Sequence, residues 1–162
     1  MIFEAQKEWI CPESFPDLKN YKYIAIDLET RDPDLKVRGS GAIMGNGEIV
    51  GIAVAVDGWS GYYPIAHQGG GNLEKDKVMD WIKSVCAADN VKLFHNAMYD
   101  VCWLRAAGVH INGHIVDTMV MSSLIDENRL SYTLNSISFE FLGEVKDEKA
   151  LIEAAQSWGI DP

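Results

Sequence analysis

The sequence predicts a mixed α/β fold built on one central sheet, and two observations indicate it. Apolar, β-branched stretches of strand length stand in the first half of the chain. Apolar residues at helical spacing alternate with short strand-like stretches in the second half. Strands followed by alternating helices and strands are typical of a mixed sheet with helices on its faces. The chain has 162 residues, 48% of them apolar, which suits one compact domain with a buried core.

Three strands are expected first, in a meander. Residues 23–29 (YIAIDLE) and 49–57 (IVGIAVAVD) are rich in apolar and β-branched residues, and an Asp-Gly turn leads to a third stretch at 61–65. Pro64 favours an edge position for the third strand, because proline cannot donate a hydrogen bond to a neighbouring strand. A glycine-rich segment, residues 31–47, is expected to be a loop between the first two strands.

Helices and short strands are expected to alternate in the second half. Apolar spacing predicts a helix over residues 78–85, and Gly108 ends a further helix over 97–107. Two short stretches, 91–94 and 115–116, are predicted as parallel strands. Three more helices follow: one entered near Asp117, one over residues 134–141 that stops at Gly143, and one over 148–158.

Two carboxylates end the first predicted strand. Only Leu28 separates Asp27 from Glu29, and residues two apart on a strand point to the same face. Burying two unpaired carboxylates costs free energy, and a divalent cation such as Mg²⁺, which prefers oxygen ligands, offsets that cost. The alternative is a strand end that runs into a solvated loop. For an isolated D-x-E match, that alternative is the more common one.

Asn96 and Asp100 stand where the fourth predicted strand gives way to a helix. Asn96 is a favourable N-cap, and Asp100 can face the same side one turn later. In a purely structural alternative, Asn96 only caps the helix and Asp100 only complements the helix dipole. That alternative suits Asn96 better than Asp100, because the residues after Asp100 (VCWL) are apolar and favour its partial burial.

In this order and spacing, the two motifs resemble the first two exonuclease motifs of the DEDD superfamily of 3′→5′ exonucleases. Residues 24–30 (IAIDLET) are similar to the first motif, and residues 95–100 (HNAMYD) to the second. Four further segments look like the proofreading domain of family A, or DNA polymerase I-like, polymerases: residues 51–56, 63–67, 116–119 and 132–137. The likeness covers residues 23–143 of a single domain, 1–162, between an N-terminal arm (1–22) and a trailing helix (144–162).

The resemblance implies a ribonuclease H-like fold and a metal-dependent activity. Asp27, Glu29 and Asp100 match carboxylates that are both catalytic and metal-binding, at a site of two cations, Mg²⁺ or Mn²⁺. The implied reaction is hydrolysis of the terminal phosphodiester of a single-stranded or frayed DNA 3′ end, which releases nucleoside 5′-monophosphates. The implied partner is a polymerase domain that follows in the same chain.

Four residues form the candidate substrate-binding set. Asn96 matches a residue near the 3′ end of the substrate, and Thr30 is expected to line the same pocket. Leu28 and Tyr99, which stand inside the two motifs, complete the set.

The family's third motif, Tyr-x-x-x-Asp or His-x-x-x-x-Asp, has no match after Asp100. None of the later aspartates has a tyrosine four or a histidine five residues before it: Asp117, Asp126, Asp147 and Asp161. His95 stands five residues before Asp100, but Asn96 assigns Asp100 to the second motif. By the family's spacing, the fourth carboxylate falls beyond Pro162. We therefore expect a C-terminally truncated piece of a longer polymerase, weak or inactive by itself.

The net charge of −10, from 14 basic and 24 acidic residues, counts against a nucleic-acid surface of the chain's own. Divalent cations in a carboxylate cage, and tethering to a larger DNA-holding protein, reduce this objection. Three cysteines without a C-x-x-C pair favour a reducing, cytoplasmic location. The longest apolar run, residues 49–56, is shorter than the ~20 residues of a membrane span, so no membrane partner is expected.

The sequence leaves two other functions open. One is an RNA 3′-end exonuclease similar to ribonuclease D, which would differ in its treatment of the 2′-hydroxyl. The other is a non-catalytic module that binds single-stranded 3′ ends or docks a polymerase domain, and the missing fourth carboxylate favours it. Among weaker candidates, Asp117 is better explained as the N-cap of the next helix than as a metal ligand, and Cys102 as a core residue.

Overall fold

The structure is a computed structural model that describes residues 10–68 and 71–144. The helix predicted over residues 148–158 and the first residues of the arm lie outside these ranges. The chain divides into two compact units, Met1–Thr118 and Met119–Pro162, and each is described by itself.

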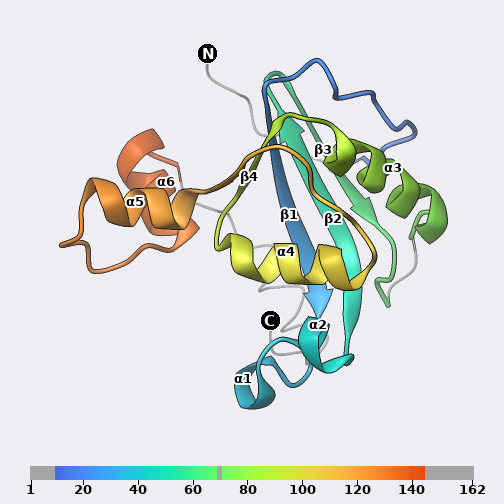
Figure 1. The fold of residues 1–162 in the computed structure, drawn as a ribbon, viewed down its shortest axis with the longest axis horizontal. Coiled ribbons are helices and arrows are strands. Elements are labelled where there is room, and N and C mark those ends of the chain that lie inside the picture. The colour runs from blue at the N-terminus through green and yellow to red at the C-terminus, as the bar shows by residue number, and fades with distance from the viewer. Residues whose placement is uncertain (1–9, 69–70, 145–162) are drawn as a thin grey trace. The chain divides into compact units, whose positions relative to one another are not determined.

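A five-stranded mixed sheet forms the centre of the first unit (Figure 1). Its order is β3-β2-β1-β4-β5. The strands are β1 (Tyr23–Arg31), β2 (Glu48–Val56), β3 (Trp59–Pro64), β4 (Val91–Phe94) and β5 (Ile115–Asp117). The first three pair antiparallel as a meander, whereas β4 pairs parallel with β1, and β5 parallel with β4. This arrangement confirms the predicted sheet, including the edge position of the strand that ends at Pro64.

Two helices, α3 (Lys75–Ala87) and α4 (Ala97–Ala106), cover one face of this sheet (Figure 1). On β1, the buried residues Ile24, Ile26 and Leu28 alternate with residues that are exposed or half-buried. This is the pattern of a strand with one face against a core. The core joins these positions to apolar residues of β2, α3 and α4: Ile52, Val54, Val78, Ile82, Val101 and Leu104.

The segment between β1 and β2 differs from the predicted loop, because it contains two short helices, α1 (Leu35–Arg38) and α2 (Gly41–Met44). Ser40 caps α2 by accepting a hydrogen bond from the Ala42 amide at 3.3 Å. Both carboxylate oxygens of Asp32 accept from the Gly41 amide, at 3.1 and 3.0 Å. Helices of four residues are too short to produce an apolar periodicity, so the sequence pattern could not reveal them.

The described part of the N-terminal arm packs against α3 and β3. The Tyr63 hydroxyl donates to the carbonyl of Ser14 at 3.0 Å, and Trp81 Nε1 donates to the carbonyl of Pro16 at 2.9 Å. Leu18 is buried in the core. These contacts satisfy the polar ends of two core aromatic side chains, as buried tyrosine and tryptophan require.

Lys92, in the middle of β4, is fully buried (0% exposed). Its ammonium donates hydrogen bonds to the carbonyls of Ala88, Asn90 (3.2 Å) and Asn112 (3.0 Å). Burial lowers the pKa of Lys92, since the charged form loses its water. The side chain therefore joins the end of α3, the start of β4 and the segment before β5 through one buried cation.

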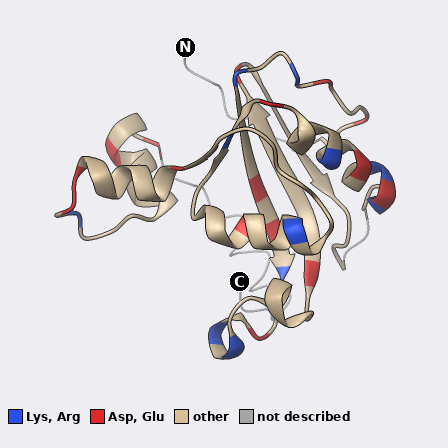
Figure 2. Ribbon diagram, viewed as in Figure 1, with Lys and Arg blue, Asp and Glu red and all other residues tan. Residues whose placement is uncertain are grey.

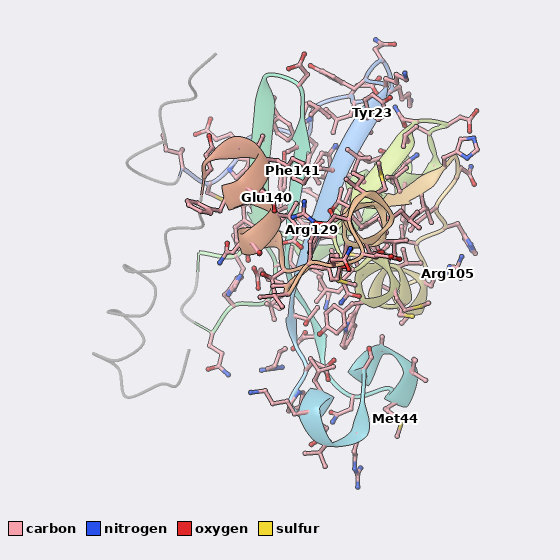
Figure 3. The ribbon with its side chains drawn as sticks, turned by 90° about the vertical axis from the view of Figure 1, so that its left-hand side faces the viewer. Tyr23, Met44, Arg105, Arg129, Glu140 and Phe141 are labelled. Carbon is pink, nitrogen blue, oxygen red and sulfur yellow. The ribbon has the colours of Figure 1, made fainter. Side chains whose placement is uncertain are left out.

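The second unit contains α6 (Leu134–Leu142) and all of α5 (Thr118–Ile125) except its first residue. Thr133 caps α6 by accepting from the Ser136 amide at 3.3 Å, and Gly143 ends it in the left-handed conformation, as predicted. Arg129 donates to Glu140 at 2.7 Å and lies over the ring of Phe141, 5.0 Å from its centroid (Figure 3). Throughout the described ranges, no helix combines the length and the apolar character that crossing a bilayer requires.

Candidate active site

Asp27 and Glu29 lie on the face of β1 opposite the helix-covered core, and both are exposed. In the register with β2, Asp27 pairs with Ala53 and Glu29 with Gly51, so small residues stand beside both carboxylates. The register shifts immediately after Glu29, between Glu29 and Thr30. Such irregularities bend a strand and turn its side chains, and they are frequent beside active sites. The strand pattern had predicted the shared face, and the structure confirms it.

Asp100, in the first turn of α4, reaches the main chain of β1. Its Oδ1 accepts a hydrogen bond from the amide of Leu28 at 3.1 Å. The paired residues of β1 and β4 end at Ala25, so Leu28 lies three residues beyond the end of that ladder. The Asp100 carboxylate thus takes the place of a missing strand partner. Leu28 contributes its amide to this contact, whereas its side chain, 7% exposed, lies in the core.

The surroundings of Asp100 disfavour the charged form of its carboxyl. The residue is 3% exposed, and burial raises the pKa of its carboxyl to about 7. The nearby charges of Asp27 and, less strongly, Asp117 contribute to this rise, while the hydrogen bond from the Leu28 amide opposes it. Asp27 and Asp100 are therefore close enough to repel each other. Figure 2 shows acidic positions on β1 and α4 in this part of the sheet.

Within the ranges that the structure describes, no three acidic, histidine or cysteine side chains are arranged as a group that could hold a metal ion. The structure brings Asp100 next to Asp27, but it does not gather all three predicted ligands into a ready cluster. The Leu28 amide holds the Asp100 carboxylate against the main chain of β1. Metal ligation by these residues stays a prediction.

Asn96 occupies the N-cap position of α4, as predicted, but it does not cap with its side chain. Its backbone is left-handed (φ 64°), and its side chain is exposed. Asp117 caps α4 instead, because its carboxylate accepts from the amides of Asn96 (3.0 Å) and Ala97 (2.8 Å). The sequence had placed Asp117 at the start of the next helix. Because Asp117 caps α4, the Asn96 side chain has no capping role.

Thr30 and Tyr99, both in the candidate substrate-binding set, contact each other. The two hydroxyl oxygens are 2.6 Å apart, and the Tyr99 hydroxyl donates to Asp32 at 3.2 Å. A phenol has one proton, so Thr30 must be the donor to Tyr99. Because Asp32 also accepts from the Gly41 amide, this chain of hydrogen bonds connects β1 and α4 to the start of α2.

Tyr62 on β3 was not among the candidates that the sequence indicated. Burial raises the pKa of its hydroxyl to about 12, and the charges of Glu29 and Asp27 contribute to this rise. Its hydroxyl also forms a hydrogen bond with Nε2 of His67. No motif signals Tyr62, because its place beside the carboxylates depends on the register of three strands.

The family model described as 3′-5′ exonuclease, of the DNA polymerase A type, matches residues 11–162. The chain belongs to this exonuclease family. A DNA-directed DNA polymerase of Pseudomonas phage M6 is 37% identical over 164 residues, which cover 96% of this chain and 24% of the phage protein. The chain thus spans about a quarter of that relative's length.

Solved structures share the fold. Brucella melitensis NrnC with bound Mg²⁺ has a TM-score of 0.58 at 18% identity, covering 87% of this chain and 68% of that one. Escherichia coli RNase D, an exoribonuclease, has a TM-score of 0.58 at 12% identity, covering 81% and 30%. These likenesses confirm a ribonuclease H-like mixed sheet for the exonuclease domain. The family match makes the domain a phosphodiester hydrolase of the 3′→5′ exonuclease class. Divalent metal use is typical of such enzymes.

Proposed function

We propose that this exonuclease domain proofreads DNA within a polymerase. It hydrolyses the terminal phosphodiester of a single-stranded or frayed 3′ end and releases a nucleoside 5′-monophosphate. The observation that carries this proposal is the meeting of two motifs from distant parts of the chain, because Asp100 lies beside Asp27 and binds the main chain of Leu28. The polymerase relative favours DNA over RNA as the substrate.

Asp27, Glu29 and Asp100 suit divalent cations by their chemistry. All three supply carboxylate oxygens, the ligands that Mg²⁺ and Mn²⁺ prefer. Burial and the repulsion from Asp27 both raise the pKa of Asp100, and a nearby cation would relieve that repulsion. When bound, Mg²⁺ or Mn²⁺ supplies Lewis-acid stabilisation of the charge that develops on the phosphate. The Leu28 amide fixes the orientation of Asp100 before any cation arrives.

The neighbouring residues would hold the end of the substrate. Asn96 has an exposed side chain with no capping role, so its amide can contact the terminal nucleotide. Thr30 and Tyr99 are fixed by their hydrogen bonds to each other and to Asp32, which gives the pocket a rigid wall. A pocket that reads only the strand end has no need of sequence-specific base contacts.

We also propose that the domain is one part of a longer polymerase and that a fourth carboxylate lies beyond residue 162. No aspartate after Asp100 in this sequence fits the third motif. The 24% coverage of the phage polymerase leaves room for that motif and for a polymerase domain.

The experiment is hydrolysis of a 5′-labelled single-stranded DNA with Mn²⁺, by this chain and by a chain extended by about fifty residues of its natural sequence. The extended chain should shorten the DNA one nucleotide at a time from the 3′ end, and Asp100→Ala should abolish this. His110→Ala, at an exposed position away from the motifs, is the matched control.

The outcomes separate the rival functions. Faster shortening of an RNA of the same sequence would replace DNA proofreading by RNA 3′-end trimming. Binding of the labelled strand without hydrolysis in either chain would indicate a non-catalytic module. Activity that survives Asp100→Ala would exclude the proposed site.

A further inference from the structure

Tyr62 lies on the same face of the sheet as the two carboxylates of β1. In the strand register, Asp27 pairs with Ala53, and Ala53 pairs with Tyr62. Directly paired residues on neighbouring strands point to the same side of a sheet. Tyr62 and Asp27 are therefore separated by one small side chain, that of Ala53.

The Tyr62 ring extends toward Glu29 over Gly51. A Cβ atom built on Gly51 would lie 1.9 Å from the Tyr62 hydroxyl oxygen and 2.4 Å from the ring carbon that bears it. Only a glycine leaves room for the phenol at this point. Gly51 is the direct partner of Glu29 in the β1–β2 register. The hydroxyl thus lies over Gly51, the β2 residue that pairs with Glu29, one strand away from the Tyr62 backbone on β3.

His67 holds the phenol of Tyr62 in this position. His67 Nε2 forms a hydrogen bond with the Tyr62 hydroxyl, and the two rings meet edge to face, 5.9 Å between centroids. Asn72 fixes the main chain of His67 by a pair of hydrogen bonds, each 2.8 Å, one to its amide and one to its carbonyl. When Nε2 carries the imidazole proton, His67 is the donor of this bond and the Tyr62 oxygen is the acceptor.

We propose that Tyr62, oriented by His67, is a positioning residue that holds the Glu29 carboxylate for cation binding by donating it a hydrogen bond. This inference rests on the proposed metal site and adds a residue from β3 to it. A tyrosine hydroxyl ordinarily keeps its proton at physiological pH, so the donor is present there. Hydrogen-bonded partners of metal ligands fix the ligand's direction, and their loss weakens metal binding about 10- to 100-fold.

The test is the dissociation constant for Mn²⁺, measured on this chain by electron paramagnetic resonance of the free ion. Tyr62→Phe keeps the ring and removes the hydroxyl, and it should weaken Mn²⁺ binding about tenfold. Its urea midpoint without metal should fall only slightly, through the lost hydrogen bond to His67, and this small change beside a tenfold loss of Mn²⁺ affinity separates positioning from a merely structural role. Tyr23→Phe, at the start of the strand that carries Glu29 (Figure 3), is the matched control and should bind as the unaltered chain does.

A second variant tests the same proposed contact between Tyr62 and Glu29 but keeps the Tyr62 hydroxyl. Gly51→Ala forces the Tyr62 ring away from Glu29, and it should also weaken Mn²⁺ binding. Equal affinities for Tyr62→Phe and the unaltered chain would overturn the positioning role. Asp27→Ala checks the underlying site. If Asp27→Ala binds Mn²⁺ as tightly as the unaltered chain, the proposed metal site itself is wrong.

Discussion

The amide of Leu28 donates a hydrogen bond to Oδ1 of Asp100 at 3.1 Å, although 72 residues separate them in the chain. The contact forms because β1 continues past the end of its pairing with β4, which leaves main-chain groups of β1 without a strand partner on that side. A buried carboxylate satisfies one of them. The two motifs are thereby joined through the main chain, and Asp100 is fixed beside Asp27 before any metal binds.

The first prediction concerns stability against pH in the absence of metal. The pKa of Asp100 rises from 3.8 to about 7 on folding, so the folded chain holds this proton more tightly than the unfolded chain does. The resulting contribution of Asp100 to the free energy of unfolding is fully present below about pH 4 and is lost as pH rises through about 7. The loss is at most about 4 kcal/mol. Urea unfolding in EDTA from pH 4 to 8 measures it.

The control for this prediction is Asp100→Asn, which cannot titrate. The difference in unfolding free energy between the unaltered chain and this variant should change between pH 4 and 7 and be constant above pH 8. A difference that is constant over the whole range would show that the Asp100 carboxyl is not perturbed.

The second prediction concerns the cation. Mg²⁺ or Mn²⁺ should raise the melting temperature. At a metal concentration 100 times the dissociation constant, the free energy of unfolding should increase by about 2.7 kcal/mol. Asp27→Ala removes one of the repelling charges next to Asp100, so it should raise the melting temperature without metal and abolish the shift with metal. Differential scanning fluorimetry in EDTA and in MnCl₂ measures both. Ca²⁺-free buffer with added Na⁺ is the control for ionic strength. An Asp27→Ala chain that melts lower without metal contradicts the repulsion.

The third prediction concerns the start of α4. Asp117→Ala removes the acceptor of the Asn96 and Ala97 amides, and it should destabilise the chain by about 1–2 kcal/mol in urea unfolding. Asn96→Gly should leave the stability unchanged or raise it, because glycine adopts φ 64° without strain. If Asn96→Gly is instead the more damaging change, Asn96 is the true cap.

Local patterns predicted the strands and the longer helices of this fold because their signals are strong over short distances. The β-branched run of β1 and the apolar spacing of α3 each identify their own element. The alternation of a strand also predicted that Asp27 and Glu29 share a face. These inferences need only the period of side chains along one element.

Other features depend on contacts that no local pattern encodes. Asp117 caps α4 across a distance of about twenty residues in sequence, and Tyr62 reaches Glu29 only through the register of β1, β2 and β3. The burial of Lys92 follows from carbonyls that two segments direct at it, the turn between α3 and β4 and the segment before β5. In each case the decisive partner is set by tertiary structure, which one sequence read along its length does not specify.

The fourth prediction concerns Lys92. Lys92→Met has a similar length but no donor, so the carbonyls of Ala88, Asn90 and Asn112 lose a buried partner. The cost should be about 3 kcal/mol or more. Lys83→Met, on the exposed side of α3, loses only a surface ion pair with Asp80 and should cost less than about 1 kcal/mol. Equal costs for the two variants would show that the buried hydrogen bonds of Lys92 contribute nothing specific.

The last prediction separates the structural and functional tasks of Tyr99. Tyr99→Phe removes the hydroxyl that connects Thr30 to Asp32, and it should destabilise the chain by about 1–2 kcal/mol, since one of these bonds is to a carboxylate. Without the Tyr99 donor, Asp32 is less firmly oriented toward the Gly41 amide. Hydrogen exchange should therefore speed up at the amides of Gly41 and Ala42 but not in α3. Tyr21→Phe, with a partly exposed ring, is the control. Unchanged exchange at Gly41 in Tyr99→Phe would mean that Asp32 holds α2 without help, and that the Tyr99 hydroxyl serves the substrate pocket alone.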